Sequence, residues 1–252
     1  MVTALVTGAS SELGAEYARQ LADRGADIVL VGRDRQALDA VAAEVRSRGR
    51  DAEVLVADLL EPDQIAAVVA RLTDPQRPIE VLVSNAGHGL PLAFEKNDIE
   101  AEVRHLRLHD EVALRLMHAA LGAMLARGHG RILAVASIAA FMPRSTYGAV
   151  KQFLVSFCRW ANAVYAPRGV TVTAVCPGFV HTNFHERLGL PPGQEGIAGW
   201  MWLDAPTVVR ASLRDLGRGT AVSIPSVRYK RIARLLPLLP ARLTARLGQR
   251  GR

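Results

Sequence analysis

Short runs of apolar residues alternate along the chain with longer stretches whose apolar positions recur at helical spacing. An uninterrupted apolar run is typical of a strand that is buried on both faces, and the helical spacing is typical of a helix with one buried face. The predicted strands cover residues 4–6, 28–31, 52–56, 81–83, 131–136, 170–175 and 221–224. The predicted helices cover residues 15–25, 37–49, 62–72, 99–127, 146–169 and 206–216.

This alternation predicts an α/β fold, because parallel strands need a crossover helix between them. We expect a single Rossmann-like domain over residues 1–225, with a doubly wound parallel sheet of about seven strands and helices on both faces. Residues 190–204 are rich in Gly and Pro and follow the sixth strand. They lie where such sheets bind ligands, so a substrate-side lid is expected there. Residues 226–252 are expected to form a basic helical tail.

The distribution of charge narrows the choice of partners. The net charge is +7, but from Arg228 onward the sequence has eight Lys or Arg and no Asp or Glu, so the rest of the chain carries −1. A nucleic-acid enzyme usually carries its positive charge on the folded body, and we therefore expect no nucleic-acid partner. The tail either packs on the domain with its Arg residues in water or weakly contacts an anionic membrane surface. Pro237 and Pro240 interrupt any continuous amphipathic helix there.

Cysteine usage and the apolar pattern bear on the compartment. Cys158 and Cys176 lie in apolar segments without CxxC spacing, so we expect buried thiols and neither a metal site nor a disulfide. The first residues already predict a strand, which leaves no room for a signal peptide. No apolar run approaches the length of a membrane span. A cytoplasmic location is expected.

The segment TGASSELG joins the first predicted strand to the first predicted helix. Such a turn sets helix N–H groups against a pyrophosphate and predicts a dinucleotide site, with a plain strand–turn–helix joint as the alternative. Gly8 permits a tight exit from the strand, and Gly14 lets helix and strand pack closely. Ser10 and Ser11 offer hydroxyl groups to the helix end or to phosphate.

The second predicted strand leads into Arg33, about 20 residues after the glycine turn. An acid at this position would bind the ribose of NAD, whereas Arg suits the 2′-phosphate of NADP. Arg35 can assist it. The sequence therefore predicts NADP(H) as cofactor, and a solvated Arg at a strand end is the alternative.

A group of three residues predicts acid–base chemistry. Tyr147 and Lys151 are four residues apart on a predicted helix and share a face. A phenol titrates near pH 10, and an ammonium one turn away lowers its pKa. Tyr147 can then give a proton to a carbonyl oxygen, or take one from an alcohol. Ser137, which ends the preceding strand, can hydrogen-bond the same oxygen and fix its position.

The combination resembles the short-chain dehydrogenase/reductase family over residues 2 to about 225. The matching elements are Thr7-Gly8-Ala9-Ser10-Ser11-x-Leu13-Gly14, Arg33, Asp58-Leu59, Asn85-Ala86-Gly87, Ser137, Tyr147-x-x-x-Lys151, Pro177-Gly178 and Thr182. Each is weak alone, and together they are specific. The resemblance implies that Ser137, Tyr147 and Lys151 are catalytic.

The resemblance also implies a cofactor site. Asp58 would bind the adenine amino group, Leu59 would pack on the ring, and Lys151 would hold the nicotinamide ribose. Asn85 would line the adenosine side and support the central strands. The full implied set is Gly8, Ser10, Ser11, Leu13, Arg33, Asp58, Leu59, Asn85, Ala86, Gly87, Tyr147, Lys151, Pro177, Gly178, Val180 and Thr182.

Two residues depart from the family pattern. Glu12 stands where the family usually has Gly, and we interpret it as a solvent-directed acid that mildly disfavours the cofactor. His109 falls where the family has the helical Asn of its proton relay, and a relay role or none are both open. His105–His109 and His181–His185 also have metal-ligand spacing, but neither pair has an evident third ligand, and no metal is expected.

The leading hypothesis is an NADPH-dependent oxidoreductase that interconverts a ketone and a secondary alcohol on a hydrophobic substrate of acyl, steroid or polyketide type. The alternatives are a cofactor-binding sensor or scaffold with little turnover, and a membrane-surface protein that acts through its basic tail. A homodimer or homotetramer is expected from the resemblance. Candidate substrate-pocket residues are His88, Phe94, Phe141, Met142, Phe179, Trp200 and Trp202.

Overall fold

The computed structural model describes residues 2–182, 197–236 and 240. Its strands are β1 (Val2–Thr7), β2 (Ala26–Gly32), β3 (Ala52–Val56), β4 (Val81–Ser84), β5 (Gly130–Val135), β6 (Val170–Val175) and β7 (Val222–Ser223). Within the described residues they form one parallel sheet in the order β3-β2-β1-β4-β5-β6-β7. The predicted doubly wound α/β class is confirmed.

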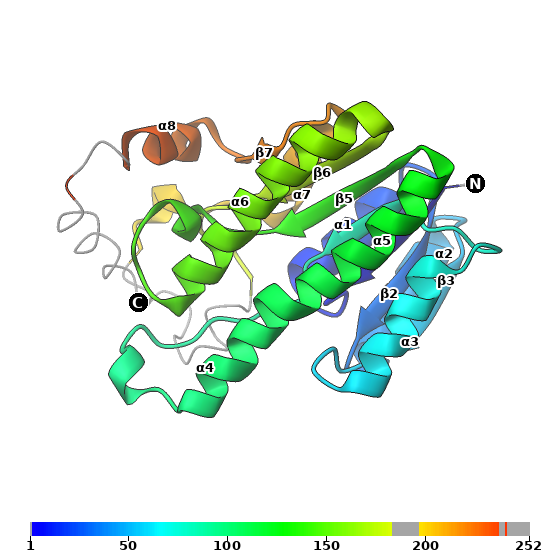
Figure 1. Cartoon of the computed structure of the whole chain (residues 1–252), viewed down its shortest axis with the longest axis horizontal. Coiled ribbons are helices and arrows are strands. Elements are labelled where there is room, and N and C mark those ends of the chain that lie inside the picture. Colours follow the sequence, from blue (N-terminus) through cyan, green and yellow to red (C-terminus); the bar gives the residue numbers. More distant parts are fainter. Residues whose placement is uncertain (1, 183–196, 237–239, 241–252) are drawn as a thin grey trace.

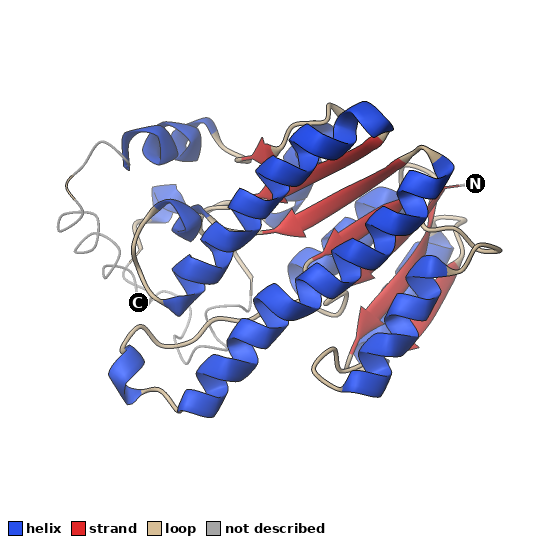
Figure 2. Cartoon of the chain, in the orientation of Figure 1, coloured by secondary structure: helices blue, strands red, loops and turns tan. Residues whose placement is uncertain are grey.

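The helices in the described part of the chain cover both faces of this sheet (Figures 1 and 2). They are α1 (Glu12–Ala22), α2 (Arg35–Ser47), α3 (Pro62–Thr73), α4 (Ile99–Leu106), α5 (Ala113–Arg127), α6 (Thr146–Tyr165), α7 (Ala205–Gly217) and α8 (Val227–Leu235). One core contains buried residues of α3, α5 and α6, and the other contains those of α1, α2 and α7.

The apolar runs have no polar alternation because both sheet faces are buried. Successive side chains of a strand point to opposite faces. In β1, Leu5 faces the core under α3, α5 and α6, whereas Ala4 and Val6 face the core under α1, α2 and α7. The strands β1 to β6 therefore each contribute apolar side chains to two cores.

The predicted helix over residues 99–127 is divided by one wide turn. Between α4 and α5 the segment Arg107–Val112 is π-helical, so its backbone hydrogen bonds span five residues instead of four. Apolar spacing does not reveal such an insertion, and the sequence predicted one regular helix. The wide turn carries His109 and Asp110, and His109 is buried.

The strand order reverses between β1 and β4, which makes this the switch point of the sheet. In such sheets the crevice beyond the carboxyl ends of the strands at the switch point is where ligands bind. Ser11 caps α1 just after β1, where its Oγ accepts a hydrogen bond from the Gly14 N–H at 3.1 Å. The residues that the sequence singled out for chemistry lie mainly at this edge.

Candidate active site

A cavity of about 160 Å³ opens at the carboxyl ends of the central strands. Residues after β1, β4, β5 and β6 contribute to it, together with residues of α6 and the π-helical turn. Its lining consists of Ser11, Glu12, Leu13, Asn85, Gly87, His109, Val135, Ala136, Ser137, Ile138, Ala139, Arg144, Tyr147, Lys151, Pro177, Gly178, Phe179, Val180 and Thr182. The three predicted catalytic residues thus share one cavity with much of the predicted cofactor set.

The glycine turn is held in a shape that side chains would prevent. Gly8 has a positive φ of 62°, and a Cβ added to Gly14 would lie 2.2 Å from the Gly8 carbonyl oxygen. The amide Nδ2 of Asn85 donates hydrogen bonds to the carbonyls of Thr7 and Gly8 at 3.0 and 3.2 Å. Asn85 therefore ties the end of β4 to the turn after β1 and fixes the start of α1.

Glu12 is the first residue of α1 and is exposed, as expected of an acid in a first helical turn. Its backbone has a negative φ, because no non-glycine residue of the described chain has a positive one. The side chain also borders the cavity. A carboxylate consequently stands at the rim of the predicted phosphate site without straining the turn.

Most of the predicted adenosine side lies outside the cavity lining, and of that set only Asn85 and Gly87 line the cavity. The Arg33 guanidinium lies 3.7 Å from the Asp58 carboxylate, and the Arg33 side chain is 77% exposed. The Ser10 Oγ lies close to Gly32, at the end of β2. Leu59 is packed in the core with 6% exposure. Ala86 packs against the same core.

The predicted catalytic residues are brought together by β5 and α6. Lys151 is 4% exposed, and its ammonium donates a hydrogen bond of 2.7 Å to the Val135 carbonyl at the end of β5. Its Nζ lies 5.5 Å from the centre of the Tyr147 ring. The Ser137 Oγ accepts a hydrogen bond from the Ala139 N–H at 3.1 Å, which fixes the serine at the strand end. Burial lowers the pKa of Lys151 to about 8.

Three histidines pack behind Tyr147. The His105 and His109 ring centres are 4.4 Å apart, and they lie 6.0 and 5.8 Å from the Tyr147 ring centre. The Nε2 of His109 lies 2.8 Å from the His88 carbonyl oxygen and 3.2 Å from the His88 N–H. Burial lowers the pKa of His105 to about 4 and that of His109 well below its ordinary value. Both rings are therefore neutral at pH 7.

Asp110 places a carboxyl group within electrostatic range of Lys151. Its pKa is raised to about 6 because the group is half-buried, and the Lys151 charge opposes that rise. The carboxylate in turn raises the pKa of Lys151 against the stronger effect of burial. The π-helical turn thus supplies both a neutral imidazole and a counter-charge beside the predicted catalytic residues.

On the side of the cavity where the substrate is predicted, two irregular segments pair with each other: the chain after β6, which lines the cavity, and residues 197–204, which are not among its lining residues. Phe179 and His181 pair with Leu203 through backbone hydrogen bonds of 2.9 Å, which fastens the described part of the predicted lid, residues 197–204, to the chain after β6. Residues 190–196 of that lid and His185 lie outside the described residues. The Tyr229 ring of α8 covers Gly178, where an added Cβ would meet it at 2.0 Å.

Among the candidate pocket residues, only Phe179 lines the cavity. Phe94 and Trp200 are 55% and 62% exposed, and the Trp202 ring stacks on His181 at 4.6 Å. The sequence missed Arg144, Ile138 and Ala139, which also line it. Their position in the loop between Ser137 and Tyr147 is the feature of the sequence that could have indicated them as lining residues.

In the described ranges no group of three or more His, Cys, Asp or Glu side chains is arranged to hold a metal ion. None of the helices described is long and apolar enough to cross a membrane.

Comparison with known proteins agrees with this geometry. The pattern of the family described as short chain dehydrogenase matches residues 2–191. A Streptomyces violaceoruber protein named as a ketoacyl reductase of the granaticin polyketide synthase is 34% identical over 222 residues, which cover 85% of this chain and 80% of that protein. The chain belongs to the short-chain dehydrogenase/reductase family, and the predicted class of oxidoreductase is confirmed.

Two solved structures share the fold over nearly the whole chain. A short-chain dehydrogenase from Sphingobium yanoikuyae in complex with NADPH has a TM-score of 0.83 and 34% identity, and the match covers 92% of each chain. A bulky-bulky ketone specific alcohol dehydrogenase from Comamonas testosteroni has a TM-score of 0.80 and 30% identity, with 93% of this chain and 91% of that chain covered.

Proposed function

We propose that the protein is an NADPH-dependent oxidoreductase that interconverts bulky, hydrophobic ketones and secondary alcohols. The observation that carries the proposal is the convergence of Ser137, Tyr147 and a buried Lys151 on the cavity that the glycine turn also borders. Family membership supports the reaction class.

The turn and Arg33 fit the proposed cofactor. The close approach of Gly8 and Gly14 leaves the N-terminal end of α1 open to a pyrophosphate, because no Cβ stands in the way. At the end of β2 the guanidinium of Arg33 is exposed, and it can pair with a 2′-phosphate by exchanging its contact with Asp58. The NADPH complex of the Sphingobium yanoikuyae relative supports the same assignment.

In the proposed mechanism, NADPH supplies a hydride to the carbonyl carbon. Tyr147 donates its phenolic proton to the carbonyl oxygen, and Ser137 hydrogen-bonds that oxygen and holds it in reach. The buried Lys151 ammonium favours the phenolate that remains on Tyr147. In the oxidative direction Tyr147 takes the proton from the alcohol.

The proposed substrate class rests on the walls of the cavity. Ile138, Phe179 and Val180 give the catalytic end an apolar lining, which favours hydrophobic substrates. The ketone specificity in the name of the Comamonas testosteroni relative supports bulky groups on both sides of the carbonyl. Arg144 adds one cation to this wall.

A screen of NADPH oxidation against ketones of graded size tests the proposal. We expect turnover to rise with the size of the apolar groups and to fall in Tyr147→Phe. NADPH binding without turnover of any ketone would contradict the enzyme assignment and favour the sensor or scaffold alternative.

We also propose that His109 takes the part of the family's relay Asn. A neutral imidazole, like an amide, offers one donor and one acceptor, and the low pKa of His109 keeps it neutral. One nitrogen is held by the His88 backbone, and the ring borders the cavity. His109→Asn should therefore retain most of kcat, whereas His109→Phe should lose about tenfold or more with NADPH affinity unchanged. Equal kcat in the two variants would show that His109 has no relay role.

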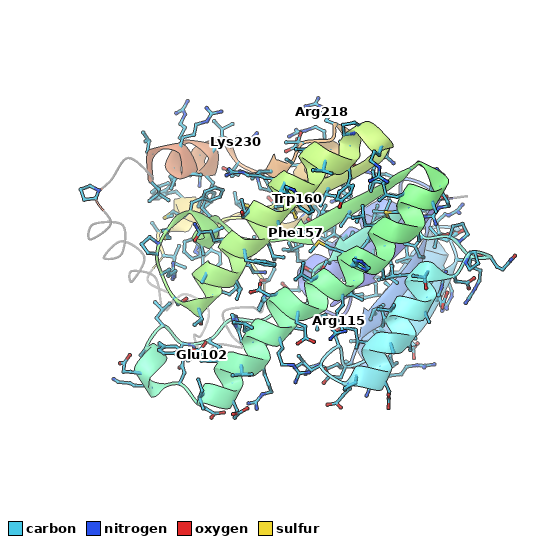
Figure 3. All side chains as sticks on the ribbon, viewed as in Figure 1. Glu102, Arg115, Phe157, Trp160, Arg218 and Lys230 are labelled. Carbon is cyan, nitrogen blue, oxygen red and sulfur yellow. The ribbon has the colours of Figure 1, made fainter. Side chains whose placement is uncertain are left out.

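The proposed oligomer involves the outer face of α6. Trp160 and Val164 are 52% and 41% exposed there, and Phe157 and Trp160 project from this helix in Figure 3. Such a patch of large apolar side chains is typical of a protein–protein interface. Trp160→Glu should shift the mass measured by light scattering toward the monomer. An unchanged mass would place the interface elsewhere.

A further inference from the structure

The helix α8 has one face buried in the protein and one face in water. Tyr229, Ala233 and Leu236 are buried, with Tyr229 and Ala233 in a small apolar cluster that includes Ile138. The exposed positions of the opposite face carry only basic and apolar side chains. These exposed residues are Val227, Arg228, Arg231, Arg234 and Leu235.

Tyr229 fixes this helix to the wall of the catalytic cavity. Its hydroxyl donates a hydrogen bond of 2.7 Å to the Met201 carbonyl and accepts one of 3.2 Å from the Phe179 N–H. Phe179 and Ile138 both line the cavity. The orange α8 accordingly lies beside the yellow turn Gly199–Met201 in Figure 1. Whatever binds the outer face of α8 is thereby brought to the substrate side of the molecule.

Trp200 extends the outer face of α8. Trp200 is 62% exposed, and the Arg228 guanidinium lies 5.3 Å from the centre of the Trp200 ring. Val227 and Leu235 are 67% and 59% exposed at the two ends of the helix. We call Trp200 and the exposed residues of α8 the basic face. It combines an exposed indole, two aliphatic side chains and a row of guanidinium groups.

The charge of the surrounding sequence has one sign. After Asp215 the chain has no Asp or Glu, and residues 241–252 add four Arg. No acidic neighbour on α8 can therefore neutralise the basic face. Clusters of basic residues with interfacial Trp and aliphatic side chains are suited to anionic lipid headgroups, because the cations meet phosphate while the apolar groups enter the interface.

We propose that the basic face binds an anionic membrane surface and thereby seats the substrate side of the protein on the bilayer. This membrane proposal rests on the proposed function. It also names the source of the substrate, which is a hydrophobic ketone dissolved in the membrane. An acidic protein or a nucleic acid would satisfy the guanidinium groups. A nucleic acid would give the aliphatic Val227 and Leu235 no apolar partner. An acidic protein could use these side chains as well as the guanidinium groups, so the test below includes it as an outcome that contradicts lipid binding. The combination of an exposed Trp, aliphatic side chains and a row of Arg on one helix face is the pattern of a membrane-surface helix, and this favours lipid.

The test is co-sedimentation of the full chain with vesicles of phosphatidylglycerol and phosphatidylcholine, with pure phosphatidylcholine for comparison. Each basic residue at an anionic surface strengthens binding by about fivefold, so Arg228→Gln/Arg231→Gln/Arg234→Gln should weaken it by about 100-fold. Raising salt from about 0.1 M to about 1 M should release the parent protein. A blue shift of Trp fluorescence on binding should be lost in Trp200→Phe.

A matched control distinguishes an effect of the basic face from an effect of net charge alone. Arg131, Arg168 and Arg218 are exposed and lie at the amino ends of β5, β6 and β7, the opposite edge of the sheet. Their triple Gln variant removes the same charge and should keep vesicle binding within a few-fold of the parent. Figure 3 labels Arg218 of this set and Lys230 of α8.

Activity distinguishes this inference from the proposed function. Both triple variants should reduce a water-soluble ketone at the parental rate, and only the α8 variant should lose activity on a long-chain ketone held in anionic vesicles. Equal loss of binding in both variants, binding to pure phosphatidylcholine, or binding to RNA or an acidic protein without binding to vesicles would each overturn the membrane proposal. Absence of turnover on every ketone, with vesicle binding intact, would instead overturn the proposed function.

Discussion

The two sides of the predicted site, here called the cofactor wall and the catalytic wall, hold their ionisable groups in different surroundings. On the cofactor wall, Glu12 borders the cavity and is exposed, and Arg33, which lies beyond the cavity lining just after β2, has a side chain that is 77% exposed. On the catalytic wall, formed by α6 and the π-helical turn, Lys151 and His109 are 4% and 2% exposed. Water screens the charges on the cofactor wall, whereas the buried charges on the catalytic wall are nearly unscreened. Loss of the proton donor on the catalytic wall should therefore have the largest effect.

The largest effect should come from Tyr147→Phe. The variant keeps the ring and loses the proton donor, so kcat should fall by about 10²–10⁴-fold while NADPH affinity stays within a few-fold. Steady-state kinetics on a good ketone substrate and a fluorescence titration of NADPH measure the two quantities. If kcat of the Phe variant were within a few-fold of that of the parent, Tyr147 would not be the proton donor. The difference expected between the two walls would then be absent.

Arg33→Ala should have the next largest effect, confined to the choice of cofactor. A charge-assisted contact with phosphate is worth about 10- to 150-fold, and the exposure of Arg33 points to the lower end of that range. The ratio of kcat/KM for NADPH to that for NADH should fall accordingly, with kcat at saturating cofactor unchanged. Arg46→Ala, at an exposed position in the last turn of α2, is the matched control. An unchanged ratio in Arg33→Ala would take this residue out of the cofactor site.

Glu12→Gly tests how a charge on the cofactor wall affects cofactor binding. The carboxylate repels a pyrophosphate at the start of α1, and its removal should tighten NADPH binding by about 2- to 30-fold, least at high salt. The helix should lose a little stability, because an acid in the first turn favours it. Titration at low and high salt measures this effect. Weaker binding in the Gly variant would show that Glu12 contacts the cofactor directly.

Asp110→Asn should produce the smallest change, a shift of pH dependence. The Asp110 charge raises the pKa of Lys151, which burial lowers to about 8. Removing that charge lowers the pKa of Lys151 further, so the ammonium is lost at lower pH and the alkaline limb of kcat moves to lower pH. Asp110→Glu keeps the charge and should keep the parental profile. Coincident limbs in the Asn variant and the parent would show that Asp110 does not support Lys151.

The two walls also differ in how far the sequence predicts them. The cofactor turn is local: Gly8, Ser11 and Gly14 lie within one strand–helix joint, and their spacing alone indicates the shape that the structure has. The Tyr147–Lys151 spacing is equally local, because both residues lie on α6. Patterns of this kind depend only on neighbours along the chain.

The rest of the catalytic wall depends on contacts between distant segments. The packing of His88 against His105 and His109 needs the π-helical turn, which leaves no mark in the apolar spacing. The aromatic candidates were chosen for their place after strand ends, but α8 decides which side chains reach the cavity. Tyr229 fastens Phe179 at the wall, and Trp200 remains on the outer surface.

The most direct test of the proposed reaction is transfer of deuterium to a bulky ketone from NADPH in which both hydrogens on the reactive carbon are deuterium. We expect the alcohol product of the parent protein to carry one deuterium on the former carbonyl carbon, and the rate of its formation to fall by about 10²–10⁴-fold in Tyr147→Phe. Oxidation of the labelled cofactor without deuterium in the alcohol, or equal rates in the two proteins, would contradict the proposed reaction.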